Sequence, residues 1–271
     1  MTTSKRIALI VLTVFIGFTL NSCRKNDRDN DTDKSASQDN AIAENAFAGI
    51  FKSIGQYTDS TSLLRAGCAS YTVDSIGTTS WPKTLTIDYG TTNCMGADGN
   101  LRRGKIIASF TGRYRDSLTV ITISLVGYYH NNNLVQVGTH TITNNGHNAS
   151  GNLTYSINVV NANIVNTSGA TISWNSYRTR EWIAGESTTS DPMDDVYSIT
   201  GTANGTSVNG NTFTVSIDSP LIVALNCPYI QQGKLTLTPA NLSPRTIDFG
   251  SGACDNKAIV TINAVEYEIT M

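Results

Sequence analysis

The feature that most restricts the fold of this chain is a two-residue periodicity that starts near Cys68 and continues to the C-terminus. In the segment 212–218, Phe213, Val215 and Ile217 fall on one face and polar residues on the other. Such alternation is typical of half-buried strands. The turn signals between these segments are Asn-rich or Asn-Gly, at 131–133, 144–146, 204–205 and 209–210. They predict roughly a dozen strands in an all-β antiparallel meander, forming either a sandwich or a curved barrel-like sheet.

One segment before these strands has helical periodicity instead. Apolar side chains recur at three- and four-residue steps between residues 39 and 56, and they are Ile42, Ala46, Phe47, Ile50, Phe51 and Ile54. This pattern predicts an amphipathic helix, with Asp39 or Asn40 as its cap. We therefore assign residues 39–66 to an N-terminal helix and its connection, and residues 67–271 to a β domain on which the helix packs.

The first residues have the organisation of a bacterial export signal. Lys5 and Arg6 precede an apolar run over residues 7–20, which is short for a bilayer span. The run ends in Leu20-Asn21-Ser22-Cys23, which resembles the lipobox of bacterial lipoproteins. We predict a signal peptide over residues 1–22 and a lipid on Cys23, rather than a single-pass anchor that happens to contain a cysteine. Two or more acyl chains anchor a protein stably, at about 0.8 kcal/mol per buried methylene group.

The segment after Cys23 is polar, and residues 23–38 are expected to form an acidic, solvated tether. Its aspartates at 29, 31 and 33 imitate the start of an EF-hand loop. The imitation ends at Lys34, where that loop needs glycine, and at Asn40, where it needs a bidentate glutamate. We predict no metal site here.

The β domain contains an internal repeat, in residues 68–115 and 227–271. Each copy contains Thr-Ile-Asp-(Tyr/Phe)-Gly-x-x-x-Cys, ending at Cys94 in the first copy and at Cys254 in the second. Each of these cysteines follows an earlier one, Cys68 or Cys227. The sequence separation is nearly the same in the two copies. An even number of cysteines in an exported chain indicates disulfides, and the repeat predicts the pairs Cys68–Cys94 and Cys227–Cys254. Four buried thiols are the alternative.

Together these features resemble a family of uncharacterised Bacteroidota lipoproteins. The resemblance is carried by the lipobox, the apolar helix, the repeated segment, Arg103 to Ile106, Thr179 to Trp182, and Cys254 to Asn256. It covers nearly all of the mature chain and departs at Leu118 and Ala264, where we expect glycine in turns. The resemblance implies that the protein is anchored to the outer membrane by lipid and faces the cell surface or the periplasm. It implies no particular activity.

The strand expected between residues 170 and 183 is the candidate binding site. Trp174, Arg178, Arg180 and Trp182 lie at even positions and share one face of a regular strand. Two indoles flanking two guanidinium groups suit the stacking and hydrogen bonding that a glycan needs. A buried ladder of stacked rings and cations is the alternative, which we favour.

Signals for catalysis are weak. The three histidines, at 130, 140 and 147, lie among Asn, Gly and Thr and are expected to be exposed. We find no H-E-x-x-H or G-x-S-x-G motif, and no cofactor is indicated. The formal net charge of −2 and 15% charged residues exclude an electrostatic nucleic-acid binder. We predict a non-enzymatic binding or structural role, with a glycan or an envelope protein as candidate partner besides the membrane. A surface glycan-binding accessory protein is the second hypothesis, and an envelope hydrolase the third.

Overall fold

The computed structural model describes residues 31–58, 68–74, 80–96, 98–189 and 191–270. The predicted signal peptide and Cys23 lie outside these residues. Within them, α1 (Ser35–Thr58) is the α-helix, and a short 3-10 helix spans Pro192–Asp194. No helix in the described part of the chain has the length and apolar character needed to cross a membrane.

Fifteen strands follow α1. They are β1 (Ser70–Val73), β2 (Lys83–Asp88), β3 (Cys94–Met95), β4 (Leu101–Phe110), β5 (Val120–His130), β6 (Asn133–Gln136), β7 (Thr139–His147), β8 (Leu153–Val165), β9 (Thr171–Ala184), β10 (Val196–Thr206), β11 (Thr212–Ala224), β12 (Gln232–Pro239), β13 (Arg245–Ser251), β14 (Lys257–Ile262) and β15 (Val265–Thr270).

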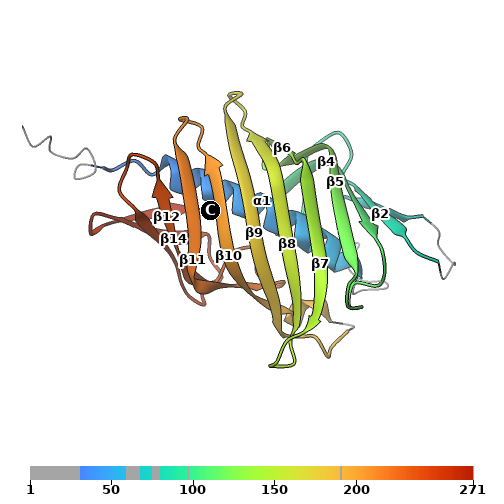
Figure 1. Ribbon diagram of the computed structural model, residues 1–271. Helices are drawn as coiled ribbons and strands as arrows, with labels where there is room; N and C mark the ends of the chain where they lie inside the picture. Colours follow the sequence, from blue (N-terminus) through green and yellow to red (C-terminus); the bar gives the residue numbers. More distant parts are fainter. Residues whose placement is uncertain (1–30, 59–67, 75–79, 97, 190, 271) are drawn as a thin grey trace, which may run out of the picture.

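All fifteen strands belong to one antiparallel sheet. The strand order is β1-β2-β4-β5-β6-β8-β9-β10-β11-β12-β13-β14-β15, with β3 paired to β4 and β7 paired to both β5 and β8. This confirms the predicted all-β meander with one helix, and it resolves the two architectures in favour of a single curved sheet. Figure 1 shows α1 crossing obliquely behind the central strands.

The sheet curves far enough for distant strands to reach neighbouring residues of the helix. The amino group of Lys52 donates to the carbonyl oxygen of Cys227, between β11 and β12. The hydroxyl of Tyr89, at the end of β2, donates to Ser53 Oγ at 2.7 Å. Two adjacent residues of α1 therefore contact both halves of the sheet.

The core lies between α1 and the inner face of the sheet. The helix contributes Ala43, Ile50 and Ile54, each at most 1% exposed. The strands contribute every second residue, as the burial pattern of β12 illustrates with Leu235 and Leu237. Burying one isoleucine or leucine side chain stabilises a fold by about 1.5–3 kcal/mol. The predicted apolar stripe accounts for how the helix docks except at Ile42, which is 38% exposed.

The helix begins earlier than predicted, at Ser35 instead of Asp39. The carboxylate of Asp33 accepts a hydrogen bond from the amide of Ser35 at 2.7 Å, which caps the first turn. Asp39 instead accepts from the amide of Val208 at 2.8 Å and ties the helix to the β10–β11 turn.

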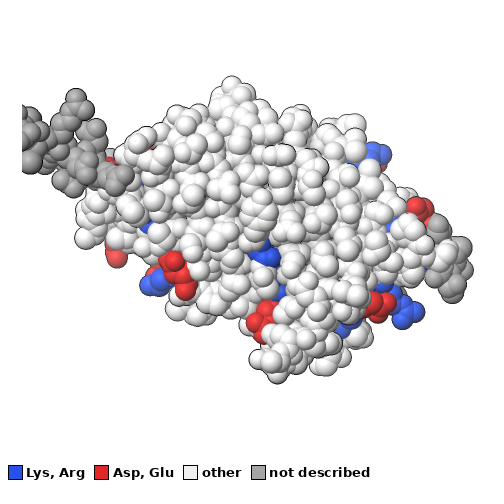
Figure 2. All heavy atoms as spheres, in the orientation of Figure 1, with Lys and Arg blue, Asp and Glu red and all other residues white. Residues whose placement is uncertain are grey.

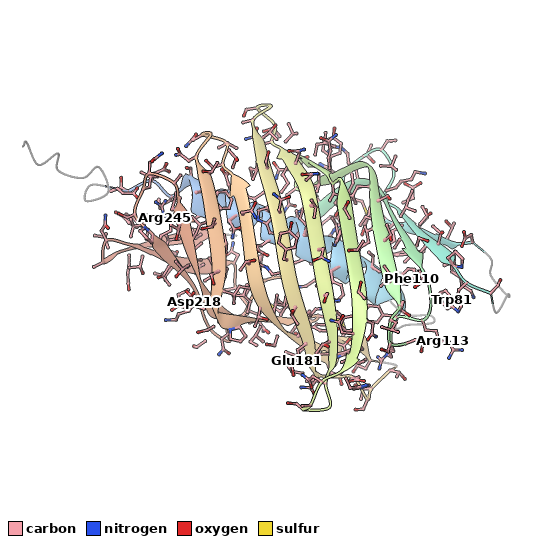
Figure 3. The ribbon with its side chains drawn as sticks, in the orientation of Figure 1. Trp81, Phe110, Arg113, Glu181, Asp218 and Arg245 are labelled. Atoms are coloured by element: carbon pink, nitrogen blue, oxygen red, sulfur yellow. A yellow bond between two sulfur atoms is a disulfide. The ribbon has the colours of Figure 1, made fainter. Side chains whose placement is uncertain are left out.

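The predicted tether over residues 23–38 is therefore too long. Asp31 forms a fully buried ion pair with Arg245 of β13, with 2.6 Å between Nη2 and the carboxylate. Arg245 also donates to the carbonyl of Asp33. Figure 3 shows Arg245 close to the point where the N-terminal segment joins the fold. Residues 31–38 thus pack on the sheet, because Arg245 supplies the partner for a carboxylate that the sequence alone presents as solvated.

Both predicted disulfides form. Cys68 bonds to Cys94, and Cys227 bonds to Cys254. In the chain-entropy model, closing loops of this size stabilises the fold by roughly 3 kcal/mol each.

The two copies of the repeat also share their local geometry. The amide of Gly90 donates to Asp88, and that of Gly250 donates to Asp248, each at 2.9 Å. A lysine pairs with each aspartate, Lys105 at 2.7 Å in the first copy and Lys234 at 2.8 Å in the second. The aspartate therefore fixes the same glycine turn in both.

Both positions where we expected glycine have a left-handed backbone. Leu118 has φ 67° and Ala264 has φ 64°, the latter in the two-residue turn between β14 and β15. Residues with a Cβ atom adopt this conformation at a cost of roughly 1–2 kcal/mol.

We predict that Ala264→Gly raises the free energy of unfolding by about 0.5–1 kcal/mol. Glycine removes the Cβ strain but loses more backbone entropy on folding, so the gain is smaller than the strain itself. Urea unfolding of the two proteins measures the difference. The control is Ala184→Gly at the exposed end of β9, where φ is not positive and glycine should not stabilise. Equal effects at both positions would contradict the turn analysis.

Candidate functional site

Strand β9 presents its even positions to the helix. Trp174 is 2% exposed and Trp182 is 1% exposed. The indole of Trp174 stacks on Phe47 of α1 and donates to Asn40 Oδ1 at 3.1 Å, while Trp182 donates to Asp195 at 3.2 Å. The glycan site predicted at Trp174, Arg178, Arg180 and Trp182 is therefore wrong, and the buried ladder of rings and cations is correct. The two-residue periodicity shows that these residues share one face of the strand. That face is internal because helix α1 covers it.

The two arginines of this ladder have different partners. Arg178 forms an ion pair with Glu44 of α1 through Nη2. Among the described residues, its Nε and Nη1 have no hydrogen-bond partner. Leaving a buried donor without a hydrogen bond costs about 1–3 kcal/mol. The hydrogen bonding of Arg178 is therefore incomplete among the described residues.

Arg180 is enclosed by aromatic rings. Its guanidinium carbon lies 3.4 Å from the ring centre of Phe51, 5.0 Å from that of Tyr197 and 5.1 Å from that of Tyr155. Nη2 donates to Tyr114 Oη at 2.9 Å, and Nε has no hydrogen-bond partner in the part of the chain that the structure describes. Such ring contacts stabilise a desolvated cation by about 2 kcal/mol. Among the ion pairs of the described residues, none includes Arg180.

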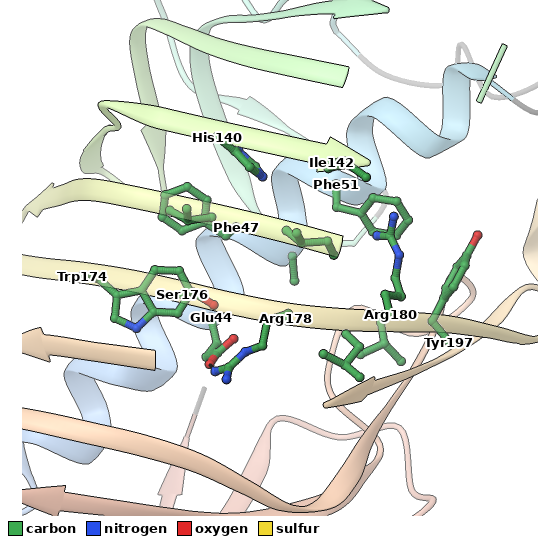
Figure 4. Close-up of a pocket in the computed structure, with 15 residues that line it drawn as sticks. Glu44, Phe47, Phe51, His140, Ile142, Trp174, Ser176, Arg178, Arg180 and Tyr197 are labelled. Carbon is green, nitrogen blue, oxygen red and sulfur yellow. Dashed lines mark hydrogen bonds and ion pairs between the residues drawn. The ribbon is translucent and has the colours of Figure 1, made fainter. Parts of the chain in front are cut away.

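A cavity of about 70 Å³ separates this part of β9 from α1. Figure 4 shows Arg178 pointing toward Glu44 and Arg180 pointing toward Phe51, and both line this cavity together with His140 of β7. The remaining walls are mostly apolar. They are formed by Phe47, Phe51, Ile142, Ile157, Val159, Trp174, Ile199 and Val223.

His140 is buried, which corrects the prediction of exposed histidines at 130 and 140. Burial and the nearby Arg180 lower the pKa of His140 to about 3, and its Nδ1 has no partner. Burial and Arg102 lower the pKa of His130 to about 4. The Asn, Gly and Thr neighbours indicated turns, but inward-facing positions of β5 and β7 hold both rings. His147 is exposed as predicted and pairs with Glu186 at 2.7 Å.

A second polar cluster lies under the C-terminal half of α1. It contains Lys52, whose pKa is lowered to about 8 by burial, and the ion pair between buried Arg102 and partly exposed Asp98. Tyr128 is fully buried nearby, and burial raises its pKa. Sequence reasoning missed this cluster because Lys52 and Tyr128 are distant in the chain from the pair Arg102–Asp98.

The outer face of the sheet is different in kind. One residue from each of eleven strands, β2, β4, β5 and β7 to β14, lies in register with the next, and we call this set the hydroxyl row. Its members are Thr84, Ser109, Thr122, Thr141, Asn158, Tyr177, Thr202, Ser216, Thr236, Thr246 and Thr261. None of them is buried, and none carries a carboxylate, ammonium or guanidinium group. Neighbouring strands place these groups about 4.8 Å apart.

Tyr177 lies at the middle of the hydroxyl row and is 46% exposed. Figure 2 shows that the upper and central parts of this face are largely uncharged, with most charged side chains near the lower and right-hand margins. Glu181 and Asp218 lie toward the lower part of the sheet in Figure 3. The strand that carries the buried indoles thus exposes Thr171, Ser173, Asn175, Tyr177 and Thr179 on its other side.

Comparisons with protein-family models, with curated proteins and with solved structures found no match to this chain. The geometry described above is therefore the basis for assigning a function.

We predict that buried His140 makes the fold sensitive to acid. The unfolded state binds a proton below its pKa of about 6.5, whereas the folded state resists protonation until about pH 3, so stability falls as pH decreases through this interval. His140→Leu should flatten the dependence by roughly 1 kcal/mol per pH unit near pH 5. Urea unfolding at pH 7, 6 and 5 measures the slope.

His130→Leu is a second variant with the same expectation, because the pKa of His130 is also lowered. An unchanged slope in both variants would show that neither ring is held neutral in the folded protein.

Proposed function

We propose that this protein is a lipid-anchored protein of the bacterial outer membrane that binds a neutral glycan without modifying it. The anchor is Cys23 at the lipobox, and the binding surface is the hydroxyl row. The uncharged character of this row from β2 to β10 is the observation that carries the proposal.

The side chains of the hydroxyl row are chemically suited to a polyhydroxylated partner. Hydroxyl and amide groups both donate and accept hydrogen bonds, as sugar hydroxyls do. Since no charge in the row has to be desolvated, a neutral chain exchanges hydrogen bonds to water for hydrogen bonds to protein at little electrostatic cost. A carboxylate reaches the row at Thr236, whose hydroxyl donates to Asp218 at 2.7 Å, so the uncharged stretch is the part from β2 to β10.

Tyr177 supplies the apolar part of the contact. A half-exposed phenol at the centre of the row offers one ring face for stacking on a sugar ring. The row runs perpendicular to the strands, so a bound extended chain would cross β5 to β12 and contact one side chain per strand.

The tether supports a location at the membrane. Asp31 is fixed by Arg245, and it lies eight positions after Cys23. At no more than about 3.5 Å per residue, the domain stays within about 28 Å of the lipidated cysteine. An outer-membrane address follows from the lipobox and from the family that the sequence resembles.

We predict that Tyr177→Ala weakens binding to a neutral polysaccharide about five-fold. Loss of one stacking contact removes about 1 kcal/mol, and surface substitutions change stability by less than about 0.5 kcal/mol. Affinity electrophoresis in gels containing xylan, mannan, dextran or β-glucan measures the retardation. Gels containing polyanionic alginate serve for comparison.

Tyr129→Ala is the matched control, because Tyr129 lies on the same face outside the row and is covered by Arg103 at 3.5 Å. Thr202→Asp adds a charge inside the row and should abolish retardation. Equal losses in the two tyrosine variants, or no retardation of the wild type by any neutral polymer, would refute the glycan proposal.

We predict that Cys23→Ala abolishes incorporation of labelled palmitate and releases the protein from the membrane fraction. Ser22→Ala keeps a small residue before the cysteine and should be labelled like the wild type. Metabolic labelling followed by fractionation gives the answer. Label retained by Cys23→Ala would place the lipid elsewhere and remove the anchor from the proposal.

A further inference from the structure

A cleft of about 410 Å³ lies at the end of β9, between that strand and the β7–β8 turn. Both segments lie at the lower margin of the sheet in Figure 1. Small-molecule sites have volumes of about 300–1,000 Å³, and the cavity beneath α1, at about 70 Å³, is far below that range. The cleft at the end of β9 is therefore large enough for a small ligand.

One side-chain contact joins the two walls of this cleft. His147 Nε2 lies 2.7 Å from Glu186 Oε1, and both side chains are partly exposed. Because a carboxylate only accepts hydrogen bonds, Nε2 is the donor. Among the described residues, the side chain of Glu186 bonds through Oε1 alone. In the neutral ring of His147 the second nitrogen is an acceptor, so Oε2 and Nδ1 are two acceptors left for a ligand.

The remaining polar lining both donates and accepts hydrogen bonds. The side-chain nitrogen of Asn152 donates to Glu181 at 2.7 Å, which fixes the amide in place. Ser187 is exposed and follows Glu186 directly in the chain. Ile183 is 41% exposed and adds apolar surface to the same cleft. The lining thus combines acceptors, an amide, a hydroxyl and a small apolar area.

The wall that carries Glu186 is held in place by its own contacts. The guanidinium group of Arg115 donates to the main-chain carbonyl of Glu186, and the hydroxyl of Thr188 donates to the carbonyl of Gly185 at 2.9 Å. Gly185 has φ 89°, and a Cβ atom there would lie 2.3 Å from Oδ1 of Asp195. A ligand therefore meets a preformed surface, which lowers the cost of binding because no loop has to be ordered.

These groups match a sugar better than a charged ligand. Sugar hydroxyls donate to the two acceptors of Glu186 and His147. They also exchange hydrogen bonds with the amide and hydroxyl groups of the lining, while the C–H face of the ring packs on Ile183. A ligand carboxylate would be repelled by Glu186, and a simple ammonium ion would leave the amide and the apolar area without a contact.

From this combination we infer that the cleft binds one or two neutral sugar units at the end of a glycan chain. The cleft is open to solvent on one side, so the rest of the chain can leave it. Ile183 lies six residues after Tyr177, about 20 Å along the strand. Since the cleft shares no residue with the hydroxyl row, the inference does not rest on the proposed function, and either stands if the other fails.

The test is a titration of the mature chain with the methyl glycosides of glucose, galactose, mannose and xylose. Trp182 borders the cleft, so indole fluorescence reports its occupancy, and calorimetry gives the affinity. At least one neutral glycoside should bind in a saturable way. Glucuronate should bind at least ten-fold more weakly than methyl glucoside, because its carboxylate meets Glu186. Methylammonium chloride should give no response.

Two variants place the binding in the cleft. Glu186→Gln removes the charge and one acceptor, and it should weaken binding of the glycoside at least ten-fold. Ala184→Trp fills the cleft with an indole and leaves Glu186 in place, and it should abolish binding. Glu268→Gln is the matched control, because it removes an exposed carboxylate that pairs with Lys257 far from the cleft, and it should bind like the wild type.

Tyr177→Ala separates the cleft from the hydroxyl row, and it should bind the glycosides like the wild type. Four results would overturn the inference. They are no saturable response to any of the neutral glycosides, an equal response to methylammonium, wild-type affinity in Ala184→Trp, and loss of binding in Tyr177→Ala. The second would mean that the cleft is a cation site, and the last that the sugar binds on the hydroxyl row instead.

Discussion

The packing of helix α1 against the inner face of the sheet is the interaction on which the other features depend. A single sheet of fifteen strands has one face that must be removed from water, and the helix supplies the covering surface. Ile50 and Ile54 form the apolar contact, while Lys52 and Ser53 bond to opposite halves of the sheet. The curvature of the sheet follows, because all these strands reach one helix only by bending around it.

This packing also separates the two faces of β9 into different environments. Trp174 and Arg180 face the helix, and their polar atoms must be satisfied inside the protein. Tyr177, between them in sequence, faces outward. The proposed binding surface and the core therefore alternate along one strand, so a change at one position leaves the opposite face largely intact.

The sequence predicts the local features of this fold well. Alternation at Phe213, Val215 and Ile217 identifies β11, and the repeated Thr-Ile-Asp motif identifies the disulfide pairs. Such signals lie within short segments, because the backbone geometry of a strand fixes the alternation of its side chains.

Features that depend on distant segments were not predictable in the same way. The sequence placed the two indoles on one face, but the choice between inside and outside depends on α1, whose Asn40 lies 134 residues before Trp174. The hydroxyl row requires the register of eleven strands, which no single strand encodes. Arg245 and Asp31 are 214 residues apart, so the packing of residues 31–38 on the sheet had no local signal.

The buried pair of Asp31 and Arg245 has a mechanical consequence for a protein held by its N-terminus. Tension on the tether would reach the fold first at this ion pair, and Arg245 would pass it to β13 before α1 is loaded. β13 pairs with both β12 and β14, and Cys227–Cys254 links the flanking loops covalently. The pull is thereby spread over several strands, and the helix that organises the core is shielded from being drawn out of the sheet.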